Sequence, residues 1–142
     1  MRADLVIPGD PVPCPRPRAT GHGVHMPEAY MVWKRKAALI LANQAIRAGF
    51  PMGMGPVRVS VVAIFDRPLS RPASVKKEDW GGGRVKRWSR PDADNVLKAV
   101  CDALQDGGIV SDDCHIEIGS VTRWYGSIGE LPSVLISVEE VT

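Results

Sequence analysis

The sequence lacks the features that would tie it to a membrane or to an oxidising compartment. It holds only three cysteines, none spaced as a CxxC pair, and no apolar run near the roughly 20 residues of a bilayer span. The N-terminal stretch MRADLVIPGDPVPCPRPR is broken by Pro and Gly too early for a signal peptide. We therefore expect a soluble, cytoplasmic protein with reduced thiols and no membrane partner.

The net charge is also small, at +2, and by itself indicates no partner. The charges are distributed unevenly, however. Residues 67–90 carry eight Lys or Arg against two acids, whereas residues 90–113 carry six aspartates, one lysine and no glutamate. A basic block beside an acidic cluster can bind a polyanion and also hold a cation. A chain of 142 residues has the size of a single domain, so we expect both segments to belong to one domain covering residues 1–142.

Hydrophobic periodicity predicts an α+β fold, with helices packed on a small mixed sheet in the order β-α-β-α-β-β. Gly and Pro residues between the elements indicate where each element begins and ends. The strands are expected at 3–9, 57–65, 114–125 and 133–141, and the helices at 28–48 and about 92–104. The last two strands are expected to pair as an antiparallel hairpin across a Gly/Pro turn.

Two segments fall outside these elements. Residues 10–20 contain four prolines and should form an extended arm. Residues 66–91 form a long basic stretch without periodicity, which we expect to be a flexible, functional loop. We predict that both bind DNA phosphates without reading sequence, through Arg16, Arg18, Lys76, Lys77, Arg84, Lys86, Arg87 and Arg90. Trp80 and Trp88, also in this loop, could stack on unpaired bases.

The acidic segment has a purely structural interpretation. On a helix from about residue 92, the apolar residues gather on one face, and Asp94, Lys98 and Asp102 form a charged line on another. Asp92 suits the N-cap position, and Asp94 suits the positive end of the helix dipole. Asp94 could also form an ion pair with Lys98, one turn later.

This interpretation leaves the pair Asp112 and Asp113 unexplained. If the connection to the next strand returns beside the helix, the two acids approach Asp92 and Asp94, and the carboxylates repel one another unless a cation neutralises them. Aspartate oxygens without His or Cys suit Mg²⁺ or Mn²⁺ rather than zinc. A carboxylate-bound Mg²⁺ beside a basic loop indicates phosphodiester hydrolysis.

The stretch PDADNVLKAVCDALQDGGIVSDD, residues 91–113, closely resembles the signature of the RusA family of Holliday junction resolvases. That resemblance implies a Mg²⁺-dependent homodimeric endonuclease, with Mn²⁺ as a possible substitute, that nicks four-way DNA junctions symmetrically in recombination and repair. By position it makes Asp92, Asp94 and Asp113 essential metal-binding acids, Lys98 the catalytic lysine and Asp112 a further metal ligand. We interpret Asn95 and Asp102, which also match the signature, as structural, with Asp102 pairing with Lys98.

Two other functions remain open at the sequence level. The motif specifies phosphodiester hydrolysis better than it specifies substrate geometry, so a related nuclease acting on flaps or other branched DNA is one alternative. The other is a non-catalytic DNA-binding module whose acids are only helix caps and surface charges.

Overall fold

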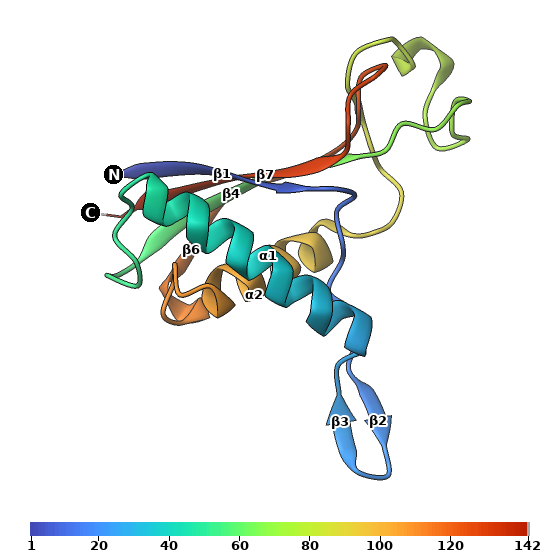
Figure 1. Cartoon of the computed structure of the whole chain (residues 1–142). Coiled ribbons are helices and arrows are strands. Elements are labelled where there is room, and N and C mark those ends of the chain that lie inside the picture. Colours follow the sequence, from blue (N-terminus) through green and yellow to red (C-terminus); the bar gives the residue numbers. More distant parts are fainter. Residues whose placement is uncertain (142) are drawn as a thin grey trace.

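The chain folds into a five-stranded mixed sheet with two helices on one face (Figure 1). A computed structural model describes residues 1–141, apart from the side chains of Arg18 and Thr20. The strand order is β1-β7-β4-β6-β5, and only the β4–β6 pair is parallel. The strands are β1 (Arg2–Pro8), β4 (Val57–Phe65), β5 (Val85–Lys86), β6 (Ile116–Tyr125) and β7 (Ser133–Glu140), and the helices are α1 (Glu28–Arg47) and α2 (Ala93–Asp106).

The core lies between the sheet and the helices. In β4, alternate residues Val57, Val59, Val61 and Ala63 are buried, because successive side chains of a strand point to opposite faces. Helix α2 adds an apolar stripe at helical spacing, namely Val96, Ala99, Val100, Ala103 and Leu104. The stripe anchors α2 on the sheet and leaves its opposite face, which carries the acids, toward solvent.

The α+β class, the mixed sheet and the long elements in their expected order are confirmed. The predicted hairpin between the last two strands is wrong. Strands β6 and β7 do not pair with each other, since they lie on opposite sides of β4. Five of the nine residues of β4 are β-branched, and the strand pairs along both edges, so it separates the two strands that adjoin in sequence.

Short elements add to the predicted order. Strands β2 (Arg18–Thr20) and β3 (Gly23–His25) form a small hairpin that projects from the start of α1 (Figure 1). Two 3₁₀ turns also occur, η1 (Lys77–Asp79) and η2 (Asp113–His115), and the second leads directly into β6. None of the helices within residues 1–141 is long and apolar enough to cross a membrane.

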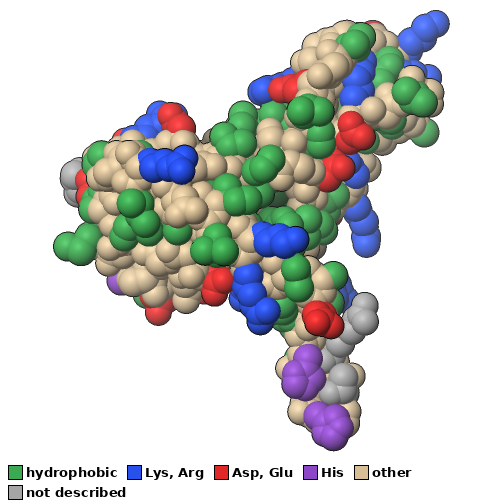
Figure 2. Space-filling view, viewed as in Figure 1, with side chains coloured by type: hydrophobic (Ala, Val, Ile, Leu, Met, Phe, Trp, Pro, Cys, Tyr) green, Lys and Arg blue, Asp and Glu red, His purple; other side chains and the backbone are tan. Residues whose placement is uncertain are grey.

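Residues 66–91 form a lobe that projects from the far end of the sheet, where Lys and Arg side chains are interspersed with hydrophobic ones (Figures 1 and 2). Side chains fasten this lobe to the sheet. The Arg67 guanidinium donates to the carbonyl oxygens of Gly81, Gly83 and Gly126, and lies 4.0 Å from the centre of the Trp80 ring. Trp80, for which we predicted stacking on unpaired bases, is therefore not exposed. Its ring is half-buried and packs edge-on against Tyr125.

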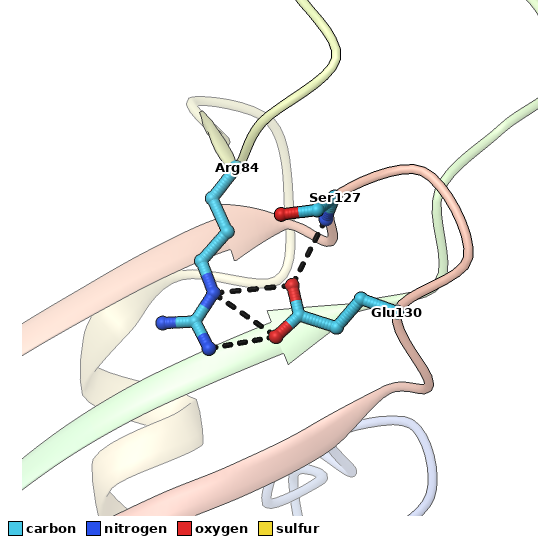
Figure 3. A network of polar contacts seen from close by, with 3 residues as sticks. All are labelled: Arg84, Ser127 and Glu130. Atoms are coloured by element: carbon cyan, nitrogen blue, oxygen red, sulfur yellow. Dashed lines mark hydrogen bonds and ion pairs between the residues drawn. The ribbon is translucent and has the colours of Figure 1, made fainter.

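A bidentate ion pair also joins the lobe to the β6–β7 turn. The Arg84 guanidinium faces the Glu130 carboxylate, with its Nη2 2.6 Å from Oε2, and the backbone N–H of Ser127 donates to the same carboxylate (Figure 3). These contacts, with the hydrogen bond from Arg84 dominant, lower the pKa of Glu130 to about 2. The carboxylate is therefore ionised at any physiological pH.

Candidate functional site

The acids at the start of α2 make neither the capping hydrogen bond nor the ion pair that a structural role would predict. Asp92 is the N-cap residue, as predicted, but its side chain makes no capping hydrogen bond. Asp94 and Lys98 are exposed. Among the ion pairs of the described residues, none joins Lys98 to Asp94 or to Asp102. Two carboxylates and one amine therefore face solvent at one helix end.

The chain entering α2 is held in place by β6. The Arg123 guanidinium donates through Nη1 to the carbonyl oxygens of Ser89, at 2.7 Å, and Pro91, at 2.8 Å. The hydroxyl groups of Ser89 and Tyr125 lie 3.2 Å apart, and the Arg90–Pro91 peptide bond is cis. Arg123 therefore fixes the backbone immediately before Asp92, so that the position of this carboxylate depends on the sheet.

The proline-rich arm crosses the other side of this helix end. The Cys14 N–H donates to the Asn95 carbonyl oxygen at 2.9 Å, and the Cys14 side chain is buried with Tyr30 and Ala99. Arg16, two residues further along the arm, is exposed. The arm thus packs against the first turns of α2.

Asp102 has a different partner from the one predicted. Its carboxylate accepts a 2.7 Å hydrogen bond from the Tyr30 hydroxyl on α1, and it has no ion pair with Lys98 among the described residues. Burial, followed by this hydrogen bond, raises the pKa of Tyr30, so the hydroxyl keeps the proton that it donates. Asp102 is structural, as predicted, but its task is to join the two helices.

Asp112 and Asp113 lie at the turn before β6. The Asp112 carboxylate caps η2 by accepting from the Cys114 N–H at 3.0 Å, and its pKa is lowered mainly by hydrogen bonding with Cys114. Asp113 is exposed, and its charge reaches α2. Burial first, and then the charges of Asp102 and Asp113, raise the pKa of the Cys101 thiol to about 11.

Cys101 follows Asp94 by seven residues and therefore lies on the same side of α2, about 10 Å along the axis. Asp113 lies in η2, which contacts α2. Within residues 1–141, no three His, Cys, Asp or Glu side chains come close enough to hold a metal ion. The described part of a single chain therefore does not close the predicted acids around a common point.

The predicted DNA-binding residues differ in their surroundings. Arg16, Lys76, Lys77 and Arg90 are exposed, whereas Arg84 is paired with Glu130. Lys86 places its Nζ 4.2 Å from the centre of the Trp124 ring. Arg87 is half-buried, stacks over Phe65 at 4.1 Å and donates to the Arg90 carbonyl oxygen, so it holds the lobe together. The side chain of Arg18 lies outside the described part of the chain.

Comparison with known proteins identifies the type of molecule. The family model described as endodeoxyribonuclease RusA matches residues 8–139. The chain belongs to the RusA endodeoxyribonuclease family. The uncharacterized protein YqaN of Bacillus subtilis (strain 168) is 30% identical to it over 143 residues, which cover 97% of this chain and 96% of that protein.

Membership in the RusA family assigns DNA as the substrate and hydrolysis of its phosphodiester bonds as the reaction class. Nucleases of the family depend on a divalent metal ion. The match covers the arm, both helices and the acids at either end of α2, so it extends well beyond the aspartate motif.

Sequence inspection missed the residues that position the site. Tyr30, Cys14 and Arg123 act through contacts across 32 to 88 residues of sequence, and none has a local pattern that would reveal its partner. Arg123 meets Pro91 from 32 residues away, and Cys14 lies 3.8 Å from Asp102, 88 residues away.

Proposed function

We propose that this protein is a Mg²⁺-dependent endonuclease that resolves four-way DNA junctions by paired, symmetric nicks, with Mn²⁺ able to replace Mg²⁺. The observation that carries the proposal is the family match together with Asp92 and Asp94, which face solvent without a protein partner among the described residues. Carboxylates used only for capping or for ion pairs would be occupied by those contacts. Recombination and repair are the processes in which such junctions are resolved.

The donor set fits a hard divalent cation, because it consists of aspartate oxygens with no thiolate or imidazole at the same helix end. We propose that Asp92, Asp94 and Asp113 bind the ion, and that Asp112 contributes an oxygen while it caps η2. The bound ion would polarise a phosphate and activate water. Lys98, on the face of α2 that carries Asp94, would lie against the phosphate at the cleavage point.

The same proposal includes a homodimer, and one edge of the sheet suits it. Strand β5 pairs only with the last two residues of β6, which leaves the edge of β6 open from Ile116 to Thr122. Open strand edges pair readily with a second chain. A two-fold axis across this edge would pair the strands antiparallel and present two equal sites to a junction that is itself close to two-fold symmetric.

Such a pairing would also complete the metal site. The start of β6 follows Asp113, and its end carries Arg123, which holds the backbone next to Asp92. Antiparallel pairing brings the start of one strand beside the end of the other. We propose that the third carboxylate at each site therefore comes from the partner subunit, in agreement with the open arrangement of the acids in one chain.

Asp94→Asn is the direct test of the catalytic proposal. We expect it to lower the rate of four-way junction cleavage at least about a hundredfold. Junction binding should be unchanged or tighter, because one charge that repels the DNA has been removed. Asp106→Asn, the same change at the exposed opposite end of α2, is the matched control and should cut at the normal rate. Normal cleavage by Asp94→Asn would leave a DNA-binding module as the better description.

Substrate geometry needs a second assay. Four-way, three-way, flap and linear DNAs of shared sequence are cut under identical conditions, and the nicks are mapped to the nucleotide. The proposal predicts two nicks at symmetric positions of the four-way junction. A preference for single nicks in flaps would favour the related structure-selective nuclease instead.

A further inference from the structure

The projecting lobe contains a cavity that the acidic site does not use. It has a volume of about 490 Å³, within the usual range for sites that bind small molecules or single nucleotides. Two tryptophans, Trp88 and Trp124, line it together with Lys76, Arg84, Lys86 and one acid, Asp79. Aromatic and cationic side chains are the combination with which proteins bind single-stranded nucleic acids.

One of the two tryptophans, Trp88, is available for a ligand. Trp88 is 69% exposed, which is unusual for the largest amphipathic side chain, whereas Trp80 in the same lobe is packed on Tyr125. Trp124 is held in one orientation, because its Nε1 donates to the Thr122 hydroxyl at 2.9 Å. Lys86 lies over this ring, so the cavity offers a ligand one open ring, that of Trp88.

The cationic side chains that line the cavity differ in whether they already have a partner in the protein. Arg84 is neutralised by Glu130, so its charge is committed to the fold (Figure 3). Lys86 lies over the Trp124 ring, and Lys76 is exposed, and neither has a carboxylate partner among the ion pairs of residues 1–141. Lys76 is thus the amine left to meet a phosphate beside a base.

The cavity also lies close to the acids along the chain. Trp88 precedes Asp92 by four residues, a span of at most about 14 Å. Arg123 holds the segment between them through the Ser89 and Pro91 carbonyl oxygens. Because neighbouring nucleotides of one strand rise about 3.4 Å each in duplex DNA, the cavity is within a few nucleotides of a phosphate at Asp92.

We infer that this cavity binds an unpaired base of DNA, stacked on Trp88, with Lys76 on an adjoining phosphate. A base within a duplex is covered on both faces by its neighbours and cannot enter. The inference rests on the proposed function and names the feature of branched DNA that the enzyme recognises next to the nick, namely a base that has left the helix at the branch point.

The test measures binding without divalent metal, so that nothing is cut. The probes are a labelled thymidine oligonucleotide, an oligonucleotide of the same length with abasic residues, and a blunt duplex. The unaltered protein should bind the thymidine probe about tenfold more tightly than the abasic one, because only the bases differ. Equal affinity for these two probes would overturn the inference.

The variants locate the effect. Trp88→Ala should weaken binding of the thymidine probe about tenfold and that of the abasic and duplex probes less than twofold, and Trp88→Phe should restore most of the loss. Leu131→Ala, an exposed apolar residue of the β6–β7 turn, is the control and should change none of the three. An equal loss on all three probes with Trp88→Ala would show that the ring supports the fold or the charge, not a base.

This outcome is separable from the proposed nuclease activity. A protein that prefers thymidine to abasic DNA through Trp88, yet cuts no junction, would disprove the nuclease proposal and retain the base site. A protein that nicks four-way junctions but fails the abasic comparison would retain the nuclease and lose the base site.

Discussion

At the residue scale, the aspartates of the motif differ in what they touch. Asp92, Asp94 and Asp113 face solvent, whereas Asp102 is bound to Tyr30 and Asp112 caps a turn. The sequence predicts the acidic helix and its N-cap position, because capping preferences are local. It does not predict which acids carry structural hydrogen bonds, since Tyr30 lies 72 residues from Asp102.

Tyr30→Phe tests the structural role of Asp102. The substitution keeps the ring, which stacks with Trp33, and removes the hydroxyl that Asp102 accepts from. We expect the free energy of unfolding to fall by about 1–2 kcal/mol, because a half-buried carboxylate loses its donor. Urea denaturation monitored by fluorescence measures this change.

Junction cleavage by the folded Tyr30→Phe variant should remain near normal, since Asp102 is not among the proposed metal ligands. A large loss of cleavage at unchanged stability would instead place Asp102 in the catalytic site.

At the scale of elements, the local pattern of apolar residues predicts the long helices and strands, but it does not predict which strands pair. The strand over 57–65 is β-branched at most positions, and the helix from Glu28 ends before Gly49, so both were predicted within two residues. The hairpin of β2 and β3 was missed because its strands are short and lie among prolines. The partners of β6 and β7 were missed because each pairs with β4, which the sequence does not reveal locally.

The link between the lobe and the β6–β7 turn should show in the pH dependence of stability. The pKa of Glu130 is lowered from 4.5 to about 2, so its ion pair with Arg84 stabilises the folded state above pH 4.5 and loses this effect as the pH falls toward 2. Glu130→Gln should therefore lower the free energy of unfolding at pH 7 by about 0.5–1 kcal/mol, as for other surface ion pairs.

Denaturation at a series of pH values compares the two proteins, and their stabilities should converge between pH 4.5 and pH 2. Equal free energies of unfolding at pH 7 would contradict a stabilising Arg84–Glu130 ion pair. So would a difference in these free energies that is as large at pH 2 as at pH 7. Glu139→Gln, an exposed acid of β7 without an ion pair among residues 1–141, provides the matched control and should show no such window.

At the scale of the whole molecule, the helices cover one face of the sheet, the lobe projects from one end of the sheet, and the β2–β3 hairpin projects beyond the start of α1 (Figure 1). Within residues 1–141, no three acids gather at one point. We propose that a second copy completes the site and that it binds at the open edge of β6.

Ile118→Lys tests this edge. Ile118 is 57% exposed on the unpaired part of β6, and a lysine on a strand edge opposes pairing with another chain. We expect the variant to be monomeric by analytical ultracentrifugation, to bind Mn²⁺ at least about tenfold more weakly and to lose junction cleavage. Leu131→Lys, on the exposed β6–β7 turn, should remain dimeric and active. A monomeric Ile118→Lys protein with normal Mn²⁺ binding would show that one chain forms the site alone.

The most direct measurement of the central claim is anomalous diffraction from crystals of the protein containing Mn²⁺. We predict a manganese peak within coordination distance of carboxylate oxygens of Asp92 and Asp94, with Asp113 of the partner subunit completing the site. A peak elsewhere, or saturating Mn²⁺ without any peak at these aspartates, would contradict it.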